Sequence, residues 1–447
     1  MNRRDVLKQG AAAAIGSAAA VAGGSGVSVQ AAAQQSGTGA TANQAGRRFR
    51  AFIRTVEGSA VRDVRMLPLR DDMVVVRTEA TQCCYTIVNQ ALGAGPAGGA
   101  GGAVAARILG HGGAGVVEAV GAKVTRVQPG DRVLVSNTPH CGECYSCLRG
   151  RGDLCQMNPA NGEPLVPIGE LEDGTPVHQH NNTGGFAELM ITYDWYCVPA
   201  LTQASGAELA VLGCVGATGL GAVTTFVPVA FGESVVVMGA GPVGLSAVQG
   251  ARIMGASPII CVEPIAARRE LAMKVGATMV LDPNVEGDNL VARIRSILGG
   301  PETRKLLGGR DQRANADSRG ADYVVATVGA DVIPPTVERG PDPTALVPTR
   351  QAWEMTRAGG HLVTLGLPRG NISLPAGTWS NRGRIHHAGQ YGGVNAKADV
   401  PRFVKLIDQG LFDAKSLVTA TYPLEQTREA FQAVGNRTTA CAVVTFT

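Results

Sequence analysis

The stretch Val235-Val236-Val237-Met238-Gly239-Ala240-Gly241-Pro242-Val243-Gly244 decides the fold of this 447-residue chain. Four consecutive apolar residues predict a buried strand over 235–238, and the pattern of 242–254 predicts a helix directly after the glycines. A second apolar run, Ile259–Val262, predicts another strand. Because parallel strands need a crossover connection, this strand–helix–strand order indicates a parallel sheet.

The glycines between this strand and helix predict a ligand. A GxGxxG motif alone is a weak signal, but between a strand and a helix it is specific. Gly239 permits the tight turn, Gly241 lets the backbone approach a pyrophosphate, and Gly244 lets the helix pack on the strand. Pro242 and Val243 open the helix, whose free N–H groups attract phosphates. We therefore expect a dinucleotide here; a glycine turn without a ligand is the alternative.

The residue that ends the second strand bears on which dinucleotide binds. Glu263 lies nineteen residues past Gly244. A carboxylate there accepts hydrogen bonds from both ribose hydroxyls and repels a 2′-phosphate, which favours NAD over NADP. Arg268 and Arg269 follow closely and weaken this preference, and Arg268 is itself a candidate cofactor contact.

Four cysteines crowd into fifteen residues and predict a metal site. Cys141, Cys144, Cys147 and Cys155 can supply four thiolates to one tetrahedral ion, and a closed set of four sulfurs is typical of structural zinc. A disulfide knot is the rival interpretation. The scattered Cys197, Cys261 and Cys441 are expected to be small buried hydrophobes.

The N-terminus has the layout of an export signal. Arg3-Arg4 and Val6-Leu7-Lys8 precede a run of small and apolar residues, and Ala31–Ala33 offers a cleavage site. This order resembles a twin-arginine signal peptide rather than a membrane span, with a disordered tail as the alternative. We therefore expect the twin-arginine machinery as a partner and a periplasmic protein, or a cytoplasmic one if the signal does not work.

The composition is that of a globular protein with more than one domain. The net charge is only +4, with no long basic run, which argues against nucleic acid. Before the glycine loop, runs such as Met73–Thr78, Gly115–Val120 and Arg132–Val135 predict β-strands. Gly/Pro/charge-rich segments at Gly299–Arg319 and Val332–Thr349 are predicted loop insertions. We divide the chain into a signal peptide (1–33), a disordered linker (34–48), a β-rich catalytic domain (49–214), an NAD-binding domain (215–388) and a tail that returns to the catalytic domain (389–447).

Together these features resemble the zinc-containing medium-chain dehydrogenases, the family of liver alcohol dehydrogenase. The resemblance covers about residues 50–447 and rests on the four-cysteine segment, Gly110–Gly115, Gly213-Cys214 with Thr218-Gly219, Gly239–Gly244, Gly389–Gly393 and Val443–Phe446. It implies an α/β fold: a GroES-like β-rich catalytic domain and a Rossmann domain with a doubly wound parallel sheet. It also implies a homo-oligomer, a dimer or a tetramer.

The resemblance further implies a second zinc, a catalytic one. Carried over by motif, its ligands are Cys84, His111 and Cys214, while Thr86 receives the alcohol proton and Thr218 contacts the cofactor. A lone His111 would more simply be a core histidine, but its glycine-flanked motif favours zinc. Two thiolates and one imidazole leave a fourth position open for substrate. Zinc there would stabilise the alkoxide that precedes hydride loss.

Several neighbours of these ligands depart from the family pattern. Ile87 and Gly112 stand where relatives place carboxylates near the metal, Tyr85 replaces a basic or imidazole group, and Asn89 stands where some relatives place a histidine. A less negative site makes zinc a harder Lewis acid; partial loss of zinc is the alternative. The Asn137–Pro139 and His178–Asn182 segments are expected to line the substrate pocket, with His178 and His180 solvated rather than ligating.

The sequence thus predicts an oxidoreductase that transfers a hydride between a small alcohol, or its aldehyde or ketone, and NAD. A nicotinoprotein is the first alternative: NAD stays bound and is recycled by a second substrate, which suits export to a compartment without a free nicotinamide pool. A non-enzymatic, zinc-stabilised binding protein is the second.

Overall fold

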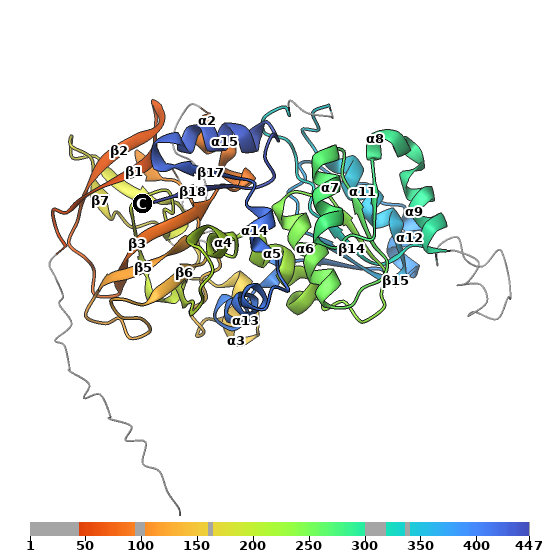
Figure 1. The fold of residues 1–447 in the computed structure, drawn as a ribbon, viewed down its shortest axis with the longest axis horizontal. Coiled ribbons are helices and arrows are strands. Elements are labelled where there is room, and N and C mark those ends of the chain that lie inside the picture. The colour runs from red at the N-terminus through yellow and green to blue at the C-terminus, as the bar shows by residue number, and fades with distance from the viewer. Residues whose placement is uncertain (1–43, 94–102, 160–163, 300–318, 336–339, 447) are drawn as a thin grey trace, which may run out of the picture. The chain divides into compact units, whose positions relative to one another are not determined.

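The parallel sheet predicted around Val235–Met238 is present in the computed structural model, which describes residues 44–93, 103–159, 164–299, 319–335 and 340–446. Within these ranges its strands lie in the order β13-β12-β11-β14-β15-β16, all parallel (Figure 1). The order is that of a doubly wound sheet whose first strand, β11, lies at the switch point. The strands span β11 Val235–Met238, β12 Ile259–Val262, β13 Met279–Leu281, β14 Ala321–Ala326, β15 Thr356–Thr364 and β16 Ile385–Ala388.

Helices cover both faces of this sheet. Side chains alternate along each strand: Val235 and Val237 of β11 pack with the helices of one face, Val236 and Met238 with those of the other. The first face holds α5, α6 and α7, and the second holds α9 and α11. The helical segments are α5 Val215–Gly221, η6 Ala222–Phe226, α6 Pro242–Ile253, α7 Ala266–Val275, α8 Pro283–Glu286, η7 Gly287–Asn289, α9 Leu290–Leu298, α11 Leu346–Met355 and α12 Ala376–Asn381.

The β-rich region contains two sheets. Strands β1-β2-β7-β8-β4 close a barrel, and β10-β6-β5-β3-β18-β17 form an open sheet in which β9 also pairs with β3. Their bounds are β1 Arg48–Thr55, β2 Gly58–Met66, β3 Met73–Gln82, β4 Ala106–Ile108, β5 Gly113–Val120, β6 Arg132–Val135, β7 Gly169–Glu170, β8 Pro176–Gln179, β9 Leu189–Tyr193, β10 Cys197–Pro199, β17 Ala420–Pro423 and β18 Ala442–Thr445.

Helical segments of 3 to 13 residues accompany these strands. They are η1 Tyr85–Ile87, α2 Val88–Leu92, α3 Tyr145–Leu148, η2 Gly152–Leu154, η4 His180–Asn182, η5 Asp194–Tyr196, α4 Gly206–Val211, η8 Gln390–Gly393, α13 Ala396–Asp408, α14 Ala414–Leu417, η9 Leu424–Gln426 and α15 Thr427–Gly435. The tail does return to the first domain, because β18 pairs with β3 through Val443 and Gln82.

Three expectations need a correction or lie outside the structure. The end of the predicted disordered linker, residues 44–48, is structured, since the Gly46 N–H donates to the Met66 carbonyl at 2.9 Å and β1 starts at Arg48. The predicted insertion 332–349 is not all loop, because α11 begins at Leu346; Pro348 is compatible with this helix since it lies in the first turn. Residues 1–33 and 300–318 lie outside the described ranges.

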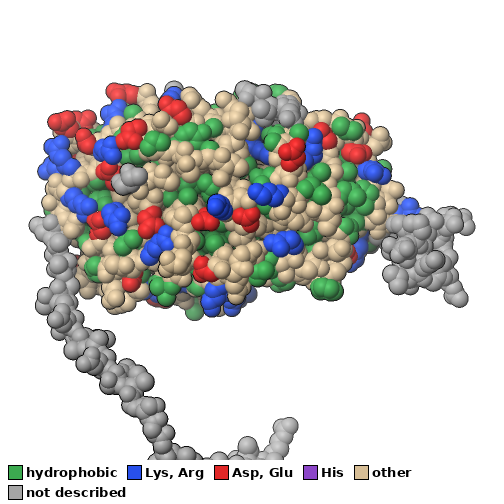
Figure 2. Space-filling model, in the orientation of Figure 1, with side chains coloured by type: hydrophobic (Ala, Val, Ile, Leu, Met, Phe, Trp, Pro, Cys, Tyr) green, Lys and Arg blue, Asp and Glu red, His purple; other side chains and the backbone are tan. Residues whose placement is uncertain are grey.

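The surface carries charges of both signs. On the face drawn in Figure 2, acidic and basic side chains are interspersed without a large patch of either sign, as expected for solvated charges. None of the helices in the described ranges is long and apolar enough to cross a membrane.

Candidate metal centre and dinucleotide cleft

The predicted ligands Cys84, His111 and Cys214 converge, although they are far apart in the sequence. Their ligand atoms all lie within 4.8 Å of one another, and the three side chains are buried. Cys84 follows β3 and precedes η1, His111 lies between β4 and β5, and Cys214 caps the N-terminus of α5. We call these three residues the ligand triad.

Glycines shape the backbone beside His111. Gly110 and Gly112 have φ angles of +98° and +128°, which favour glycine. A Cβ on Gly112 would lie 2.8 Å from the Val135 carbonyl oxygen and 3.0 Å from that of Gly213. No side chain fits at position 112 in this backbone, so the missing carboxylate is a consequence of close packing. Thr81 fixes the turn, because its hydroxyl donates to the Gly112 carbonyl at 2.7 Å.

The two triad cysteines interact directly. A hydrogen bond from Cys214, with help from His111, lowers the pKa of Cys84 well below its usual value. The same contact and burial raise the pKa of Cys214 well above it. A buried thiolate next to a thiol and an imidazole is a donor set that suits a tetrahedral metal ion. The residues present therefore fit zinc, with the cavity side of Cys84 left open.

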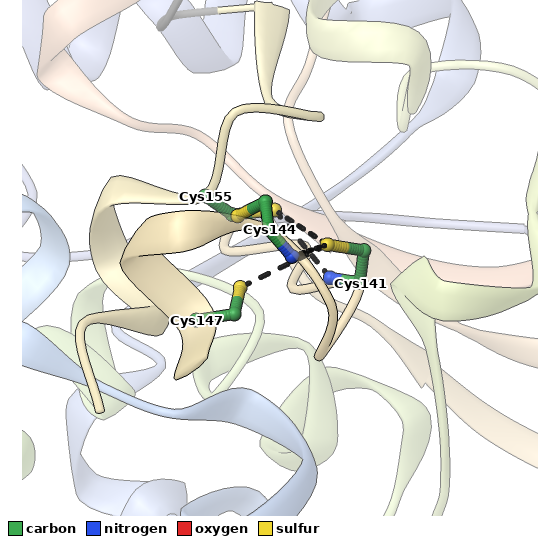
Figure 3. Close-up of side chains that lie close together, drawn as sticks. All are labelled: Cys141, Cys144, Cys147 and Cys155. Carbon is green, nitrogen blue, oxygen red and sulfur yellow. Dashed lines mark hydrogen bonds between the residues drawn. The ribbon is translucent and has the colours of Figure 1, made fainter. Parts of the chain in front are cut away.

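The four other clustered cysteines also fit a metal ion (Figure 3). The Cys141 sulfur lies 3.9 Å from that of Cys147 and 3.7 Å from that of Cys155. A tetrahedron with metal–sulfur bonds of about 2.3 Å has edges of about 3.8 Å, whereas a disulfide needs about 2.05 Å. All ten cysteines are free thiols, which contradicts the disulfide knot. Cys197, Cys261 and Cys441 are buried, as predicted.

A cavity of about 610 Å³ joins the glycine loop to the triad. It is lined by residues that follow the carboxyl ends of β11, β12, β14 and β15, where ligands bind in doubly wound sheets. Gly239, Gly241, Pro242, Val243, Glu263 and Arg268 line it, as do Cys84 and Thr86. The exposed Thr86 hydroxyl donates to the Cys84 sulfur at 3.1 Å, so it stands at the junction of cavity and triad.

Two predicted cofactor residues lie behind the cavity wall rather than on it. Gly244 packs against the loop, since a Cβ there would lie 1.9 Å from the Gly239 carbonyl oxygen. Thr218, in α5, donates its hydroxyl to the Cys214 carbonyl at 2.9 Å. Neither is among the residues that line the cavity.

The charged residues after β12 are tightly held. The buried Glu263 carboxylate accepts from the N–H groups of Ala240 at 2.6 Å and Ile265 at 3.0 Å. Arg268 donates to the Thr439 carbonyl at 2.6 Å. Arg269 donates to the Glu263 and Pro264 carbonyls and pairs with Asp282 at 3.0 Å.

Three further residues lie at the triad, of which His180 and Asn181 belong to the segment expected in the pocket and Tyr391 was not predicted. His180 was expected to be solvated but is buried, with its ring 5.5 Å from that of His111. Asn181, expected in the pocket wall, has a left-handed backbone with φ +51°. Tyr391 is electrostatically coupled to Cys84 and Cys214. A glycine-flanked tyrosine in the Gly389–Gly393 motif was the only signal for it.

Family models match both domains. The alcohol dehydrogenase GroES-like domain matches residues 70–202, and the zinc-binding dehydrogenase domain matches residues 242–339. The S-(hydroxymethyl)glutathione dehydrogenase of Haemophilus influenzae is 29% identical over 369 residues, covering 81% of this chain and 87% of the relative. The chain belongs to the zinc-containing medium-chain dehydrogenase family, a family of oxidoreductases.

Solved structures agree on the fold. The alcohol dehydrogenase zinc-binding domain protein from Burkholderia ambifaria has a TM-score of 0.73 and 27% identity, and covers 90% of this chain and 99% of its own. Benzyl alcohol dehydrogenase from Acinetobacter calcoaceticus has a TM-score of 0.73 at 23% identity, covering 90% of this chain and all of its own, a likeness of fold. The GroES-like and Rossmann domains predicted from sequence are thus confirmed.

Substitution of two glycines in the loop should separate stability from binding: one variant should lose stability, and the other should lose dinucleotide affinity. Gly244→Ala forces a Cβ against the Gly239 carbonyl and should lower the free energy of unfolding by about 3 kcal/mol. Gly241 has φ −70° and open space around its Cβ position. Gly241→Ala should leave stability unchanged but weaken dinucleotide binding roughly tenfold or more, because the methyl group meets the pyrophosphate. Thermal unfolding and a binding titration measure both; equal stability of the two variants would contradict the assignment.

Proposed function

We propose that this protein transfers a hydride between a small alcohol, or its aldehyde or ketone, and NAD, with a catalytic zinc in the ligand triad. One observation carries the proposal: a single cavity is lined by the phosphate-binding loop at Gly239 and Gly241 and by Cys84 and Thr86. A dinucleotide along the loop and an alcohol at the triad would therefore share one enclosed space, which hydride transfer requires.

The chain's residues supply binding and a route for the proton. Cys84, His111 and Cys214 would hold the zinc ion, whose Lewis acidity favours loss of the alcohol proton. Thr86 passes this proton from the alcohol oxygen to water in the cavity. The carbon-bound hydrogen leaves with both bonding electrons to the nicotinamide, so the alcohol becomes a carbonyl and NAD becomes NADH, while the hydroxyl proton is the one released through Thr86.

The contacts after β12 support NAD rather than NADP. Glu263 places a carboxylate beside the glycine loop, where it accepts from ribose hydroxyls and repels a 2′-phosphate. Two arginines near Glu263 could bind a 2′-phosphate, but both already have protein partners. Arg268 donates to a backbone carbonyl of the tail, and Arg269 binds Asp282 and two backbone carbonyls.

The four-cysteine cluster supports a second, structural zinc. Its four sulfurs leave no open position for substrate, and the cluster is not part of the cavity lining. We assign it to pinning the segment 141–155, so each chain would carry two zinc ions with different roles.

Replacement of one triad thiol tests the proposal. Cys214→Ala should reduce the zinc content from two to one per chain and lower turnover of alcohols with NAD roughly a thousandfold, since several kcal/mol of transition-state stabilisation are lost. Cys83→Ala is the control, because Cys83 is a buried neighbour of Cys84 outside the triad. Elemental analysis and NADH absorbance measure both. A Cys214→Ala protein with two zinc ions and full turnover would contradict the catalytic role of the triad, whereas a wild-type protein that binds two zinc ions and oxidises no alcohol would favour a non-enzymatic binding protein.

A second candidate, the nicotinoprotein, is favoured by contacts between the domains. The Val332 N–H donates to the Tyr85 hydroxyl at 3.0 Å, and Arg437 pairs with the buried Asp331 at 2.7 Å. The Arg437 guanidinium also lies 3.8 Å from the Tyr85 ring centre. We call Tyr85, Arg437, Asp331 and Val332 the clasp.

The clasp links the two domains at the cavity. Tyr85 and Arg437 belong to the catalytic domain, whereas Asp331 and Val332 follow β14 of the coenzyme domain. Tyr85, Val332 and Arg437 line the cavity, and so do Asp342, Val347 and Pro348 of the second insertion. Separation of the domains must break a buried ion pair, so release of a bound dinucleotide would be slow.

Retention of NAD through dialysis tests this second candidate. Purified wild-type protein should keep NAD, whereas Asp331→Asn should lose it at least roughly tenfold faster, because the buried charge pair is removed with little change in shape. Glu425→Gln is the control, since it removes the exposed Arg50–Glu425 ion pair within the catalytic domain. Nucleotide released by acid denaturation is measured by absorbance. Equal loss from wild type and Asp331→Asn would reject the clasp while leaving exchangeable NAD chemistry intact.

We also propose export to the periplasm, on the strength of Arg3-Arg4 and the small-residue segment that follows. Replacement of both arginines by lysine keeps the charge but removes the guanidinium pair, and should confine the protein to the cytoplasm. Fractionation followed by immunoblotting measures this; an unchanged periplasmic fraction would contradict the proposal. The homo-oligomer expected from the family resemblance also stays a prediction.

A further inference from the structure

Polar side chains surround the ligand triad without a role in the hydride transfer described above. His180 and Asn181 come from η4, which follows β8, and Tyr391 comes from η8. Asn181 and Tyr391 are 210 residues apart in the sequence. They meet beside the triad, so the fold rather than local sequence assembles this group.

The backbone at these residues is held in an unfavourable conformation. Asn181 has φ +51° and Tyr391 has φ +53°, which non-glycine residues rarely adopt. The next residue, Gly392, fixes Tyr391 in place because it packs on α5: a Cβ there would lie 2.1 Å from the Thr218 carbonyl oxygen. Strained backbone of this kind clusters at binding and catalytic sites.

The side chains of Tyr391 and Asn181 interact with each other. The Tyr391 side chain lies within interaction range of the Asn181 amide and of the Cys214 and Cys84 thiols. A phenol can donate one hydrogen bond and accept another.

Two buried polar atoms in this group lack a protein partner. His180 is 6% exposed and Asn181 is 4% exposed. Neither His180 Nδ1 nor Asn181 Oδ1 has a hydrogen-bond partner among the described residues. Because an unsatisfied buried polar atom is costly, such atoms beside an active site indicate a polar ligand that binds them.

We propose that His180, Asn181 and Tyr391 form a second polar subsite that binds a hydroxyl group on the carbon next to the one oxidised. This inference rests on the proposed function and names its substrate class: small vicinal diols and the corresponding α-hydroxyketones or α-hydroxyaldehydes. A hydroxyl group both donates and accepts, which matches an amide oxygen, an imidazole and a phenol.

The reaction balances for such a substrate. In 1,2-propanediol, the C2–H bond breaks and its electron pair goes with the hydrogen to NAD. The C2 hydroxyl proton leaves through Thr86 to water, and C2 becomes the carbonyl of hydroxyacetone. The C1 hydroxyl takes no part in bond breaking and is held by the subsite.

Binding of two ketones to zinc-loaded protein, with ADP-ribose in place of NAD, tests the subsite apart from turnover. Hydroxyacetone and acetone differ by one hydroxyl, and without a nicotinamide ring neither can take part in hydride transfer. Wild-type protein should bind hydroxyacetone roughly tenfold more tightly in calorimetric titrations, as expected for about one additional buried hydrogen bond. Asn181→Gly and Tyr391→Phe should each reduce this preference severalfold; glycine also tolerates the left-handed backbone at 181.

A neighbouring asparagine gives the matched control. Asn182 has φ +55°, but its amide faces the segment 164–166, where Oδ1 accepts from the Val166 N–H at 3.5 Å. Asn182→Gly should keep the tenfold preference. All variants should keep two zinc ions, so that altered binding is not a result of a lost metal site.

Turnover separates failure of the subsite from failure of the proposed function. We expect wild-type protein to have a higher kcat/KM for 1,2-propanediol than for 2-propanol, and this difference should be smaller in Tyr391→Phe. Equal kcat/KM values, or a ketone preference unchanged in Asn181→Gly and Tyr391→Phe, overturn the subsite and leave alcohol oxidation standing. If no alcohol is oxidised at all, the proposed function itself falls, and the subsite with it.

Discussion

Convergence of two thiols and one imidazole on a single point is the constraint around which the catalytic domain is built. Cys84, His111 and Cys214 lie within 4.8 Å of one another, in a buried place that would destabilise the fold if the groups stayed unpaired. Glycine at 112 brings the backbone of His111 against Val135 and Gly213, where any Cβ would collide. The strand ends of β3 and β5 and the start of α5 therefore meet at this point.

The proposed reaction also depends on the position of the triad relative to the coenzyme domain. The doubly wound order places the glycine loop at the switch point of the sheet, and the cavity that begins there reaches Cys84 and Thr86. The clasp, through contacts of Arg437 with Tyr85 and Asp331, links the two walls of this cavity. The dinucleotide loop and the Cys84 side of the metal site thus line one cavity.

The sequence predicted those strands that depend only on a local pattern of apolar residues. The strands 132–135, 235–238 and 259–262 have the predicted bounds, because short runs rich in apolar residues leave few alternatives. The triad was predicted from family motifs, because the spacing of its three residues along the sequence does not by itself indicate a metal site. Burial of His180 was missed because the left-handed turn at Asn181 redirects the chain, and the clasp was missed because Tyr85 and Val332 are 247 residues apart.

The central claim is that the triad binds zinc at the end of the dinucleotide cavity. Anomalous diffraction at the zinc absorption edge, from crystals of the NAD-loaded protein, tests it most directly. The account predicts two peaks per chain, one among Cys141, Cys144, Cys147 and Cys155 and one bonded to Cys84, His111 and Cys214 at about 2.0–2.3 Å. A peak at the four-cysteine cluster with none at the triad, in protein that still oxidises alcohols, would contradict it.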